Sequence, residues 1–257
     1  MRQTIELAEG EQLVADITPA ADGAPLALYL HGLGSHRGGT KATWLEQELV
    51  ARGFGYARFD FRGHGESSGS FDELTLTRLL DDVVAVADHL AAGRCGPPPR
   101  ALLLIGASLG GLAAAWHSLL APRHPLPIVG QVLIAPAFRL LERYLAAIGP
   151  QGRARWERDG RFRFAGPWFE FDLRWEAVVD AQRYAHERLL AESRVPTLLL
   201  HGSADETTPH EGSVAFARDC RAQRPRLVTI AGGDHRLTDA RERLRDEIVR
   251  FAEGVVR

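Results

Sequence analysis

The chain has 257 residues, of which 45% are hydrophobic and 25% are charged, enough for one large α/β domain with a sizeable core. The formal net charge of −2 at pH 7 gives no reason to expect a nucleic acid or an anionic membrane surface as a partner. The two cysteines, Cys95 and Cys220, exclude a disulfide framework and lack metal-ligand spacing, so we expect free thiols, no bound metal and a cytoplasmic location.

The N-terminal part of the chain predicts a hairpin followed by a buried strand. Residues 1–7 lack the apolar core of a signal peptide, and no apolar run along the chain approaches membrane-spanning length. Residues 4–7 and 13–17 alternate in polarity, which indicates the two strands of an edge hairpin. Residues 26–30 are apolar without a break, as in a strand covered on both faces, and they lead into the glycine-rich segment 31–34.

A second glycine-rich loop follows the next predicted helix and strand. Thr43 and Glu46 form a T-x-x-E capping box, which predicts a helix that begins there and ends near Gly53. Residues 56–60 predict a strand, and the loop 61–69 after it lacks the G-K-[ST] ending of a P-loop. We expect the polar side chains of this stretch to brace loops beneath a site rather than to act in catalysis, namely Asp60, Arg62, His64 and Ser67.

A strand, a turn with serine and a helix follow one another in the middle of the chain. Residues 101–105 predict a buried strand, and helix formers run from Leu112 with no breaker before Pro122. The segment 106–111 between them reads Gly-Ala-Ser-Leu-Gly-Gly, which makes the whole stretch a nucleophile elbow with the hydroxyl of Ser108 exposed above the sheet. A chance glycine-rich turn is the alternative. The helix before the elbow is predicted by apolar residues at helical spacing, Leu76, Leu79, Leu80, Val83, Val84, Ala87 and Leu90.

After a buried strand at residues 128–134, the alternation of strands and helices breaks. From Phe138 to about Ser193, aromatic and arginine side chains become frequent, with a small hairpin arm expected at residues 161–165. A helix is expected through Val178, Gln182 and Tyr184. An insertion of this length buries little core of its own. We therefore expect a single domain, residues 1–257, with a core of 1–137 and 194–257 and a cap of about 138–193.

Two later strands carry an acid and a histidine beyond their ends. Residues 195–200 predict a strand with Asp205 in the loop that follows, and the segment Thr-Pro-His-Glu at 208–211 predicts a helix capped by Thr208. Residues 226–230 predict the last strand, and His235 follows it. The final helix carries one apolar face, formed by Ala240, Leu244, Ile248 and Phe251.

Ser108, Asp205 and His235 each follow a predicted strand, and the carboxyl ends of parallel strands meet at one edge of a sheet. We expect His235 to act as general base on Ser108, and ionised Asp205 to orient the imidazole. The backbone amides of Leu33 and Leu109 are expected to form an oxyanion hole. Asp234 is the alternative candidate for the acid, and His31, His201 and His210 are the alternative candidates for the base. We expect these four side chains to stabilise loops instead.

Over essentially its whole length the chain resembles the α/β-hydrolase superfamily, in which nucleophile, acid and base follow the order Ser…Asp…His. The resemblance implies the α/β-hydrolase fold, a mostly parallel central sheet with helices on both faces and a short cap insertion. The chain also resembles the subfamily of acyl-protein thioesterases and mycophenolic acid acyl-glucuronide esterases, whose nucleophile, acid and base fall on Ser108, Asp205 and His235. The segments that carry this second resemblance are His31-Gly32 with Lys41-Ala42, Phe59-Asp60, Ser108-Leu109-Gly110-Gly111 and Asp234-His235-Arg236.

The predicted function is a serine hydrolase that cleaves carboxylic esters or thioesters through an acyl-Ser108 intermediate, without a cofactor. Its substrate is expected to be a small-molecule acyl ester or thioester, or an acylated protein, and the oligomeric state stays open. A serine nucleophile argues against dehalogenase and epoxide-hydrolase chemistry, which use aspartate. The alternatives are a carbon–carbon bond hydrolase or a peptidase with the same triad, or a non-catalytic binding module with this fold.

The cap suggests what the substrate looks like. Trp168 and Phe169 offer an apolar wall to an acyl or aryl group, and Arg161 and Arg163 can form paired hydrogen bonds with a carboxylate or phosphate. The alternative is that these arginines are solvated surface residues, in a chain whose only lysine is Lys41.

Overall fold

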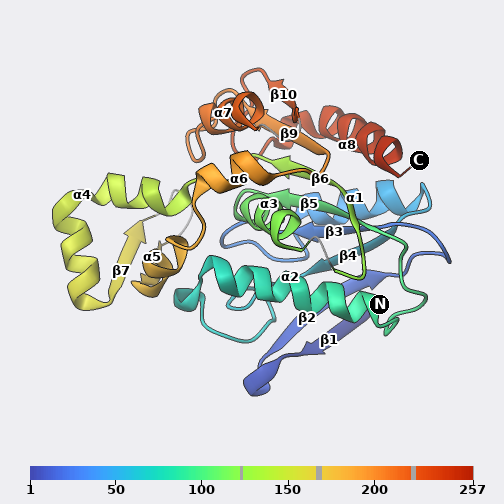
Figure 1. Cartoon of the computed structure of the whole chain (residues 1–257), viewed down its shortest axis with the longest axis horizontal. Helices are drawn as coiled ribbons and strands as arrows, with labels where there is room; N and C mark the ends of the chain where they lie inside the picture. Colours follow the sequence, from blue (N-terminus) through green and yellow to red (C-terminus); the bar gives the residue numbers. More distant parts are fainter. Residues whose placement is uncertain (122–123, 166–169, 221–223, 257) are drawn as a thin grey trace.

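The computed structural model describes residues 1–121, 124–165, 170–220 and 224–256. Its centre is an eight-stranded sheet in the order β1-β2-β4-β3-β5-β6-β9-β10 (Figure 1). Adjacent strands from β4 to β10 pair in parallel, whereas β1–β2 and β2–β4 pair antiparallel. The strands are β1 (Arg2–Glu6), β2 (Gln12–Thr18), β3 (Leu26–Leu30), β4 (Gly55–Phe59), β5 (Leu102–Ala107), β6 (Ile128–Ile134), β9 (Thr197–Gly202) and β10 (Arg226–Ile230).

Helices cover both faces of this sheet, as predicted. The helices α1 (Thr40–Val50) and α8 (Arg241–Val255) pack on the face that carries Leu103 and Ile105 of β5. The helices α2 (Leu76–Ala91) and α3 (Leu109–Leu120) pack on the opposite face, with Leu102 and Leu104. Because successive side chains of a strand point to opposite faces, a strand covered on both sides is apolar throughout, and this explains the continuous apolar runs in the sequence.

Two helices begin at other residues than the capping boxes predict. Helix α1 begins at Thr40, and the hydroxyl of Thr43 donates to the carbonyls of Gly39 and Thr40 inside the helix. Helix α7 (Glu211–Asp219) begins after the predicted cap, Thr208, whose hydroxyl bonds to Asp205 instead. Both predictions of the first residue were therefore wrong, because a side chain with another hydrogen-bond partner does not cap a helix.

The segment between β6 and β9 forms the insertion at one side of the sheet (Figure 1). It contains the predicted hairpin, β7 (Arg161–Ala165) paired antiparallel with β8 (Glu170–Arg174), and the short helices α5 (Glu176–Ala181) and α6 (His186–Glu192). It also contains a helix that the sequence did not reveal, α4 (Leu140–Asp159), in which Gly149 has a φ of 65° and Pro150 follows. This kink interrupts the helical periodicity. The division into core and cap stays a prediction.

An aromatic cluster holds the insertion together. The side chain of Trp156 is fully buried between Phe162, Phe164 and Trp175, and its indole Nε1 donates to the carbonyl of Leu173 at 3.0 Å. This cluster is continuous with the core beneath α2 and α3. The insertion is thus fixed to the sheet by apolar burial rather than by its loops alone.

The glycine-rich loop after β4 is braced as predicted. The carboxylate of Asp60 is buried and accepts hydrogen bonds from the Arg37 amide, the Arg37 guanidinium and the Glu66 amide. Arg62 pairs with Asp82 at 2.6 Å and with Glu11 at 2.7 Å. These charged pairs stabilise the loop next to the carboxyl ends of the strands. Two other residues bond to backbone groups of the same region, namely His64 and Ser67.

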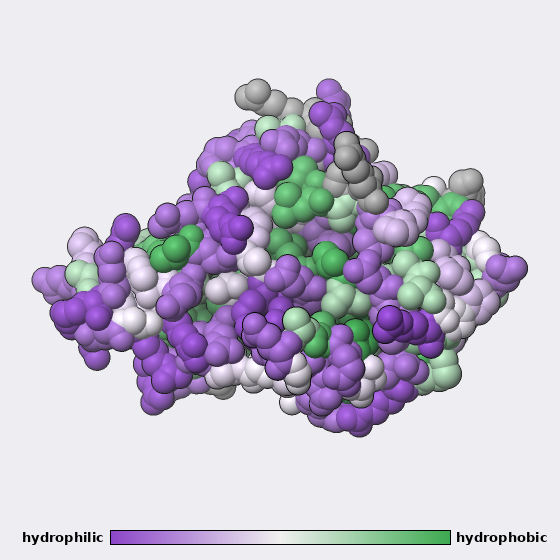
Figure 2. Space-filling view, turned by 60° about the horizontal axis from the view of Figure 1, so that its bottom comes forward, coloured by the Kyte–Doolittle hydropathy of each residue, from purple (hydrophilic) through white to green (hydrophobic). Residues whose placement is uncertain are grey.

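On the face shown in Figure 2, most of the surface is hydrophilic and hydrophobic residues gather toward the middle. Val84, one of the apolar residues whose spacing predicted helix α2, is 39% exposed and so lies outside the core. Both cysteines are free and buried. In the part of the chain that the structure describes, no helix is both long enough and apolar enough to cross a lipid bilayer.

Candidate active site

Ser108 occupies a sharp turn between β5 and α3. Its φ is 52° and its ψ is −115°, a conformation that a residue with a side chain rarely adopts and that costs about 1–3 kcal/mol. Neighbouring backbones come so close that glycine is required on both sides: a Cβ at Gly106 would lie 2.2 Å from the Gly110 carbonyl oxygen, and one at Gly110 would lie 2.1 Å from the Leu30 carbonyl oxygen. The strained turn is thus held in place by the strands beneath it.

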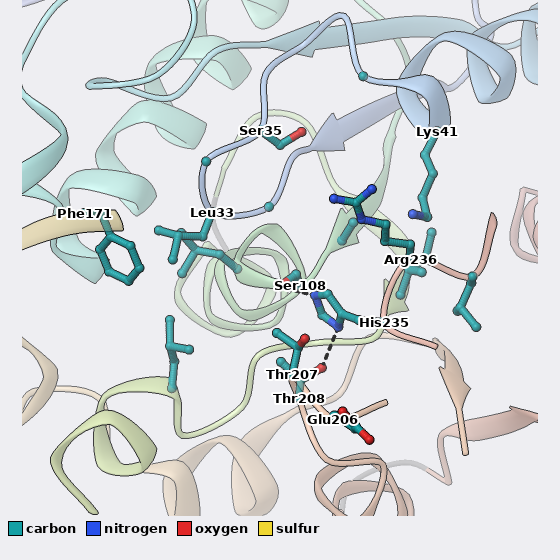
Figure 3. Close-up of a pocket in the computed structure, with 18 of the residues that line it drawn as sticks. Leu33, Ser35, Lys41, Ser108, Phe171, Glu206, Thr207, Thr208, His235 and Arg236 are labelled. Carbon is teal, nitrogen blue, oxygen red and sulfur yellow. Dashed lines mark hydrogen bonds between the residues drawn. The ribbon is translucent and has the colours of Figure 1, made fainter. Parts of the chain in front are cut away.

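The three residues predicted to form a triad lie together. His235 Nε2 is 3.1 Å from Ser108 Oγ (Figure 3). On the other side of the ring, His235 Nδ1 is 2.7 Å from Asp205 Oδ2. Each residue follows the end of a different parallel strand, β5, β9 or β10. The Asp205 carboxylate is fully buried, whereas the His235 ring is 12% exposed toward the cavity. This spacing suits proton transfer from the serine hydroxyl to an imidazole whose far side is held by a carboxylate.

Besides His235, several other groups form hydrogen bonds with the carboxylate of Asp205. Its Oδ1 accepts from the backbone amides of Thr207 and Thr208 at 2.9 and 2.8 Å, and its Oδ2 accepts from the Thr208 hydroxyl at 2.9 Å and from His201 Nε2 at 3.0 Å. Burial by itself raises the pKa of Asp205, but the hydrogen bonds from His201, His235 and the Thr208 amide outweigh it and hold the pKa well below the usual range. The carboxylate therefore stays ionised at neutral pH.

The two residues whose backbone amides are predicted to bind an oxyanion, Leu33 and Leu109, line the same cavity as Ser108. Leu109 is the first residue of α3, whose first bonds run from the Gly111 and Leu112 amides to the Ser108 carbonyl, so the Leu109 amide has no acceptor within the helix. Leu33 lies in the turn after β3, and both leucines line the cavity. A Cβ at Gly32 would lie 3.2 Å from Ser108 Cβ, which shows how closely this turn approaches the serine.

A cavity of about 1040 Å³ opens over Ser108 and has two sides of different character. Figure 3 shows Leu33 and Phe171 on one side of Ser108 and Lys41 and Arg236 on the other. The apolar side continues beneath the insertion, where Tyr144 stacks on Phe164 and Phe164 stacks on Phe171. Further apolar residues that line the cavity come from α4, namely Leu140, Ala147 and Ile148.

With this geometry in place, the relatives of the chain can be compared. A family model described as alpha/beta hydrolase family matches residues 27–247. The chain belongs to this family. It is 26% identical over 219 residues, 84% of its own length and 68% of the relative's, to the protein named mitochondrial palmitoyl-protein thioesterase ABHD10 of Bos taurus. This similarity confirms the resemblance to acyl-protein thioesterases that the motifs indicated.

Solved structures confirm the α/β-hydrolase fold. The crystal structure of a putative hydrolase from Agrobacterium vitis S4 superposes with a TM-score of 0.83 at 28% identity and covers 98% of this chain and 97% of its own. The mouse alpha/beta hydrolase domain-containing protein 10 superposes with a TM-score of 0.82 at 23% identity and covers 99% of both chains. The second match, at its lower identity, shows similarity of fold alone.

In this hydrolase the rival residues have other partners. The Asp234 carboxylate accepts from the Leu237 amide at 2.7 Å and so closes the turn after β10. His31 is buried, accepts from the Phe61 amide at its Nε2, and has its pKa lowered to about 3 by burial and by the nearby His64. His210 bonds through Nε2 to the Thr229 hydroxyl at 2.9 Å. These side chains serve the loops, as expected.

Two residues of the site have roles that the sequence did not predict. His201 was expected to serve the loops, but it donates to the carboxylate of Asp205, while its Nδ1 lies 2.7 Å from Ser213 Oγ. Thr208 was expected to cap a helix, but its hydroxyl lies between Asp205 and His235 Nδ1. One feature of the sequence could have indicated these roles: both residues lie within four positions of Asp205.

The cap residues predicted to bind substrate receive no support from the described contacts. Arg161 forms ion pairs with Asp72 and Asp172, and Arg163 pairs with Asp172 at 3.0 Å, although it lines the cavity. These carboxylates neutralise the charge that an anionic substrate would need, which favours the alternative that the arginines serve the surface. The predicted apolar wall, Trp168 and Phe169, lies outside the described residues.

The close packing of the elbow makes a prediction about stability. Gly110→Ala should lower the free energy of unfolding by about 3 kcal/mol or more, because the new methyl group meets the backbone of Leu30, which cannot rotate away. Urea denaturation measures this difference. The matched control is Gly254→Ala in α8, where alanine should be neutral or stabilising by up to about 1 kcal/mol. Apart from the chain neighbours and the helix's own backbone, a Cβ at Gly254 would meet no atom of the described residues within 4 Å. Equal unfolding free energies for the two variants would contradict the packing argument.

Proposed function

We propose that this α/β-hydrolase cleaves carboxylic esters or thioesters through an acyl intermediate on Ser108. The observation that carries the proposal is the pair of contacts of His235, 3.1 Å to the Ser108 hydroxyl and 2.7 Å to the Asp205 carboxylate. A serine hydroxyl is too weakly acidic to attack a carbonyl carbon without a base. Neutral His235 supplies that base, and ionised Asp205 keeps its Nδ1 protonated and stabilises the imidazolium.

The reaction proceeds in two halves. Ser108 Oγ attacks the acyl carbon while His235 Nε2 takes its proton, and the amides of Leu33 and Leu109 bind the developing oxyanion, each donor contributing about 3 kcal/mol. The imidazolium then returns the proton to the leaving oxygen or sulfur, and the alcohol or thiol departs. A water molecule activated by His235 attacks the acyl-serine in the same manner and releases the carboxylic acid.

The shape of the cavity supports an apolar acyl group. The side of the cavity beneath the insertion is lined by aromatic and aliphatic residues, and each buried CH₂ of a substrate contributes about 0.8 kcal/mol. The relative in Bos taurus is named a palmitoyl-protein thioesterase, so a small-molecule acyl ester or thioester or an acylated protein is the proposed substrate. That relative is named mitochondrial, and the cytoplasmic location of this chain stays a prediction.

A matched substrate panel tests the proposal. We expect turnover of S-acetyl and S-octanoyl N-acetylcysteamine and of the corresponding O-esters of N-acetylethanolamine. The octanoyl substrates should have a kcat/KM about tenfold or more above the acetyl substrates, because the longer chain fills the apolar side. Ser108→Ala is the control for contaminating hydrolases. No turnover of any of the four substrates, or the same turnover by Ser108→Ala, would contradict the proposed function.

A further inference from the structure

Cationic side chains gather on the side of the cavity opposite the insertion. Lys41 lies in the first turn of α1, Arg236 follows His235 directly, and Arg241 is the first residue of α8. Figure 3 shows Lys41 and Arg236 on the same side of Ser108 as His235, away from Leu33 and Phe171. The guanidinium carbon of Arg241 lies 5.5 Å from the ring centroid of Trp44, which also lines the cavity. Lys41 is the only lysine of the chain.

Among the described residues that line the cavity, cationic side chains outnumber carboxylates. Of the described residues that line the cavity, Glu206 alone has a carboxylate. Within the same part of the chain, neither Lys41 nor Arg241 forms an ion pair. The other cavity arginines differ, since Arg143 donates to the Thr207 carbonyl and Arg163 pairs with Asp172. A ligand anion would therefore meet in Lys41 and Arg241 two cations that form no ion pair with a carboxylate of the described residues.

Lys41 in particular lies in surroundings that compensate its positive charge only in part. Burial lowers the pKa of Lys41, the nearby Asp234 raises it, and Arg236 lowers it again, with a net decrease. An ammonium group that loses more favourable contact with water than it gains from nearby negative charge is destabilised in its charged form. An anion bound between Lys41 and its neighbours reverses this cost, so that binding such a ligand is favourable here.

The chemistry of the proposed reaction decides which part of a substrate reaches this side. His235 must return its proton to the leaving oxygen or sulfur, so the leaving group has to lie on the His235 side of Ser108. The acyl chain then lies on the apolar side beneath the insertion. The cations thus face the alcohol or thiol part of the substrate rather than the acyl part.

We propose that Lys41, together with Arg236 and Arg241, binds an anionic group, a carboxylate or a phosphate, on the leaving alcohol or thiol. This inference rests on the proposed ester or thioester hydrolysis and adds a selection among its substrates. The sequence predicted an anion site at the cap arginines. The site proposed here lies on the opposite side of the cavity. A guanidinium can hold either anion through two parallel hydrogen bonds, and an ammonium adds a compact charge.

Three thioesters with one acyl group test the proposal: S-octanoyl 3-mercaptopropionate, its neutral amide S-octanoyl 3-mercaptopropanamide, and S-octanoyl 2-mercaptoethyl phosphate. We expect the wild-type protein to prefer at least one anionic thioester over the amide by about tenfold or more in kcat/KM. A hydrogen bond to a charged group contributes about 1.5–3 kcal/mol, which corresponds to about tenfold to a hundredfold. Lys41→Met should reduce this preference by about tenfold, mainly through KM, and Lys41→Arg should retain most of it.

Matched variants separate this proposal from the proposed function. Arg163→Gln, which alters a paired cavity arginine, should leave the ratio of anionic to neutral turnover unchanged, and the exposed Arg241→Gln should lower it even if Lys41→Met fails to fold. Equal wild-type turnover of anionic and neutral thioesters, or an equal loss on both in Lys41→Met and Arg241→Gln, would overturn the anion site while leaving ester hydrolysis intact. Retained turnover of the neutral amide by Ser108→Ala would instead overturn the proposed function.

Discussion

Ser108→Ala and His235→Ala should each lower kcat by about four orders of magnitude or more while the protein stays folded. The reason is that neither residue acts alone: the hydroxyl needs a base to become a nucleophile, and the base lies 3.1 Å from that hydroxyl. The measurement is steady-state hydrolysis of S-octanoyl N-acetylcysteamine, with thermal unfolding recorded for each variant.

The double variant sharpens this prediction. Because serine and histidine act as one unit, Ser108→Ala combined with His235→Ala should be about as slow as either single variant, rather than slower by the product of the two effects. The residual rate then reports the oxyanion amides and substrate binding. A folded Ser108→Ala protein with turnover near that of the wild type would exclude the acyl-serine mechanism.

Asp205→Asn should lower kcat by about four orders of magnitude, whereas Asp234→Asn should change it by no more than about threefold. An asparagine at 205 no longer stabilises the imidazolium, and its amide group can favour the wrong tautomer of His235. Asp234 bonds to the Leu237 amide, and an asparagine oxygen can accept the same hydrogen bond. Both variants replace an aspartate by an asparagine, so a difference in kcat between them reflects the position of the carboxylate and not the type of substitution.

The same substrate and unfolding measurements serve both aspartate variants. His201, Thr207 and Thr208 surround the carboxylate of Asp205, so loss of its charge also alters the hydrogen bonds of that loop. For this reason kcat is compared only between samples with cooperative unfolding transitions. A mild effect of Asp205→Asn together with a severe effect of Asp234→Asn would show that the wrong acid was chosen.

The sequence predicted the central sheet well because its strands are buried on both faces. The strands at residues 128–134 and 226–230 coincide with β6 and β10, and the elbow lies between β5 and α3 as expected. In a chain of this composition, short continuous apolar runs bounded by glycine or proline have few structural alternatives to a buried strand. The predicted site residues also follow from the sheet, since parallel strands bring Ser108, Asp205 and His235 to one edge.

What the sequence did not reveal depends on contacts between distant residues. Thr208 is followed by Pro209 and Glu211, a pattern typical of a helix start, yet its hydroxyl is taken by Asp205 and His235. Helix α4 was missed because Gly149 and Pro150 interrupt it, and its buried side, centred on Trp156, faces the hairpin rather than the main sheet. Local patterns contain no information about such partners.

The cap arginines illustrate the same limit. Their number among aromatic residues suggested an anion site, but Asp72, which pairs with Arg161 and Arg174, lies 89 positions before Arg161. Net charge along a segment therefore differs from net charge around a cavity. Lys41 and Arg241, which form no ion pair within the described part of the chain, belong to helices on the other side of the cavity.

A fluorophosphonate probe tests the central claim, an activated serine at the elbow, most directly. The probe reacts with a serine hydroxyl only where a base and oxyanion donors activate it, and digestion followed by mass spectrometry locates the adduct. We expect one adduct on the peptide that contains Ser108, formed by the wild-type protein and formed much more slowly by the folded His235→Ala variant. Absence of an adduct on an enzyme that turns over thioesters, or an adduct at another residue, would contradict the assignment of Ser108 as the nucleophile.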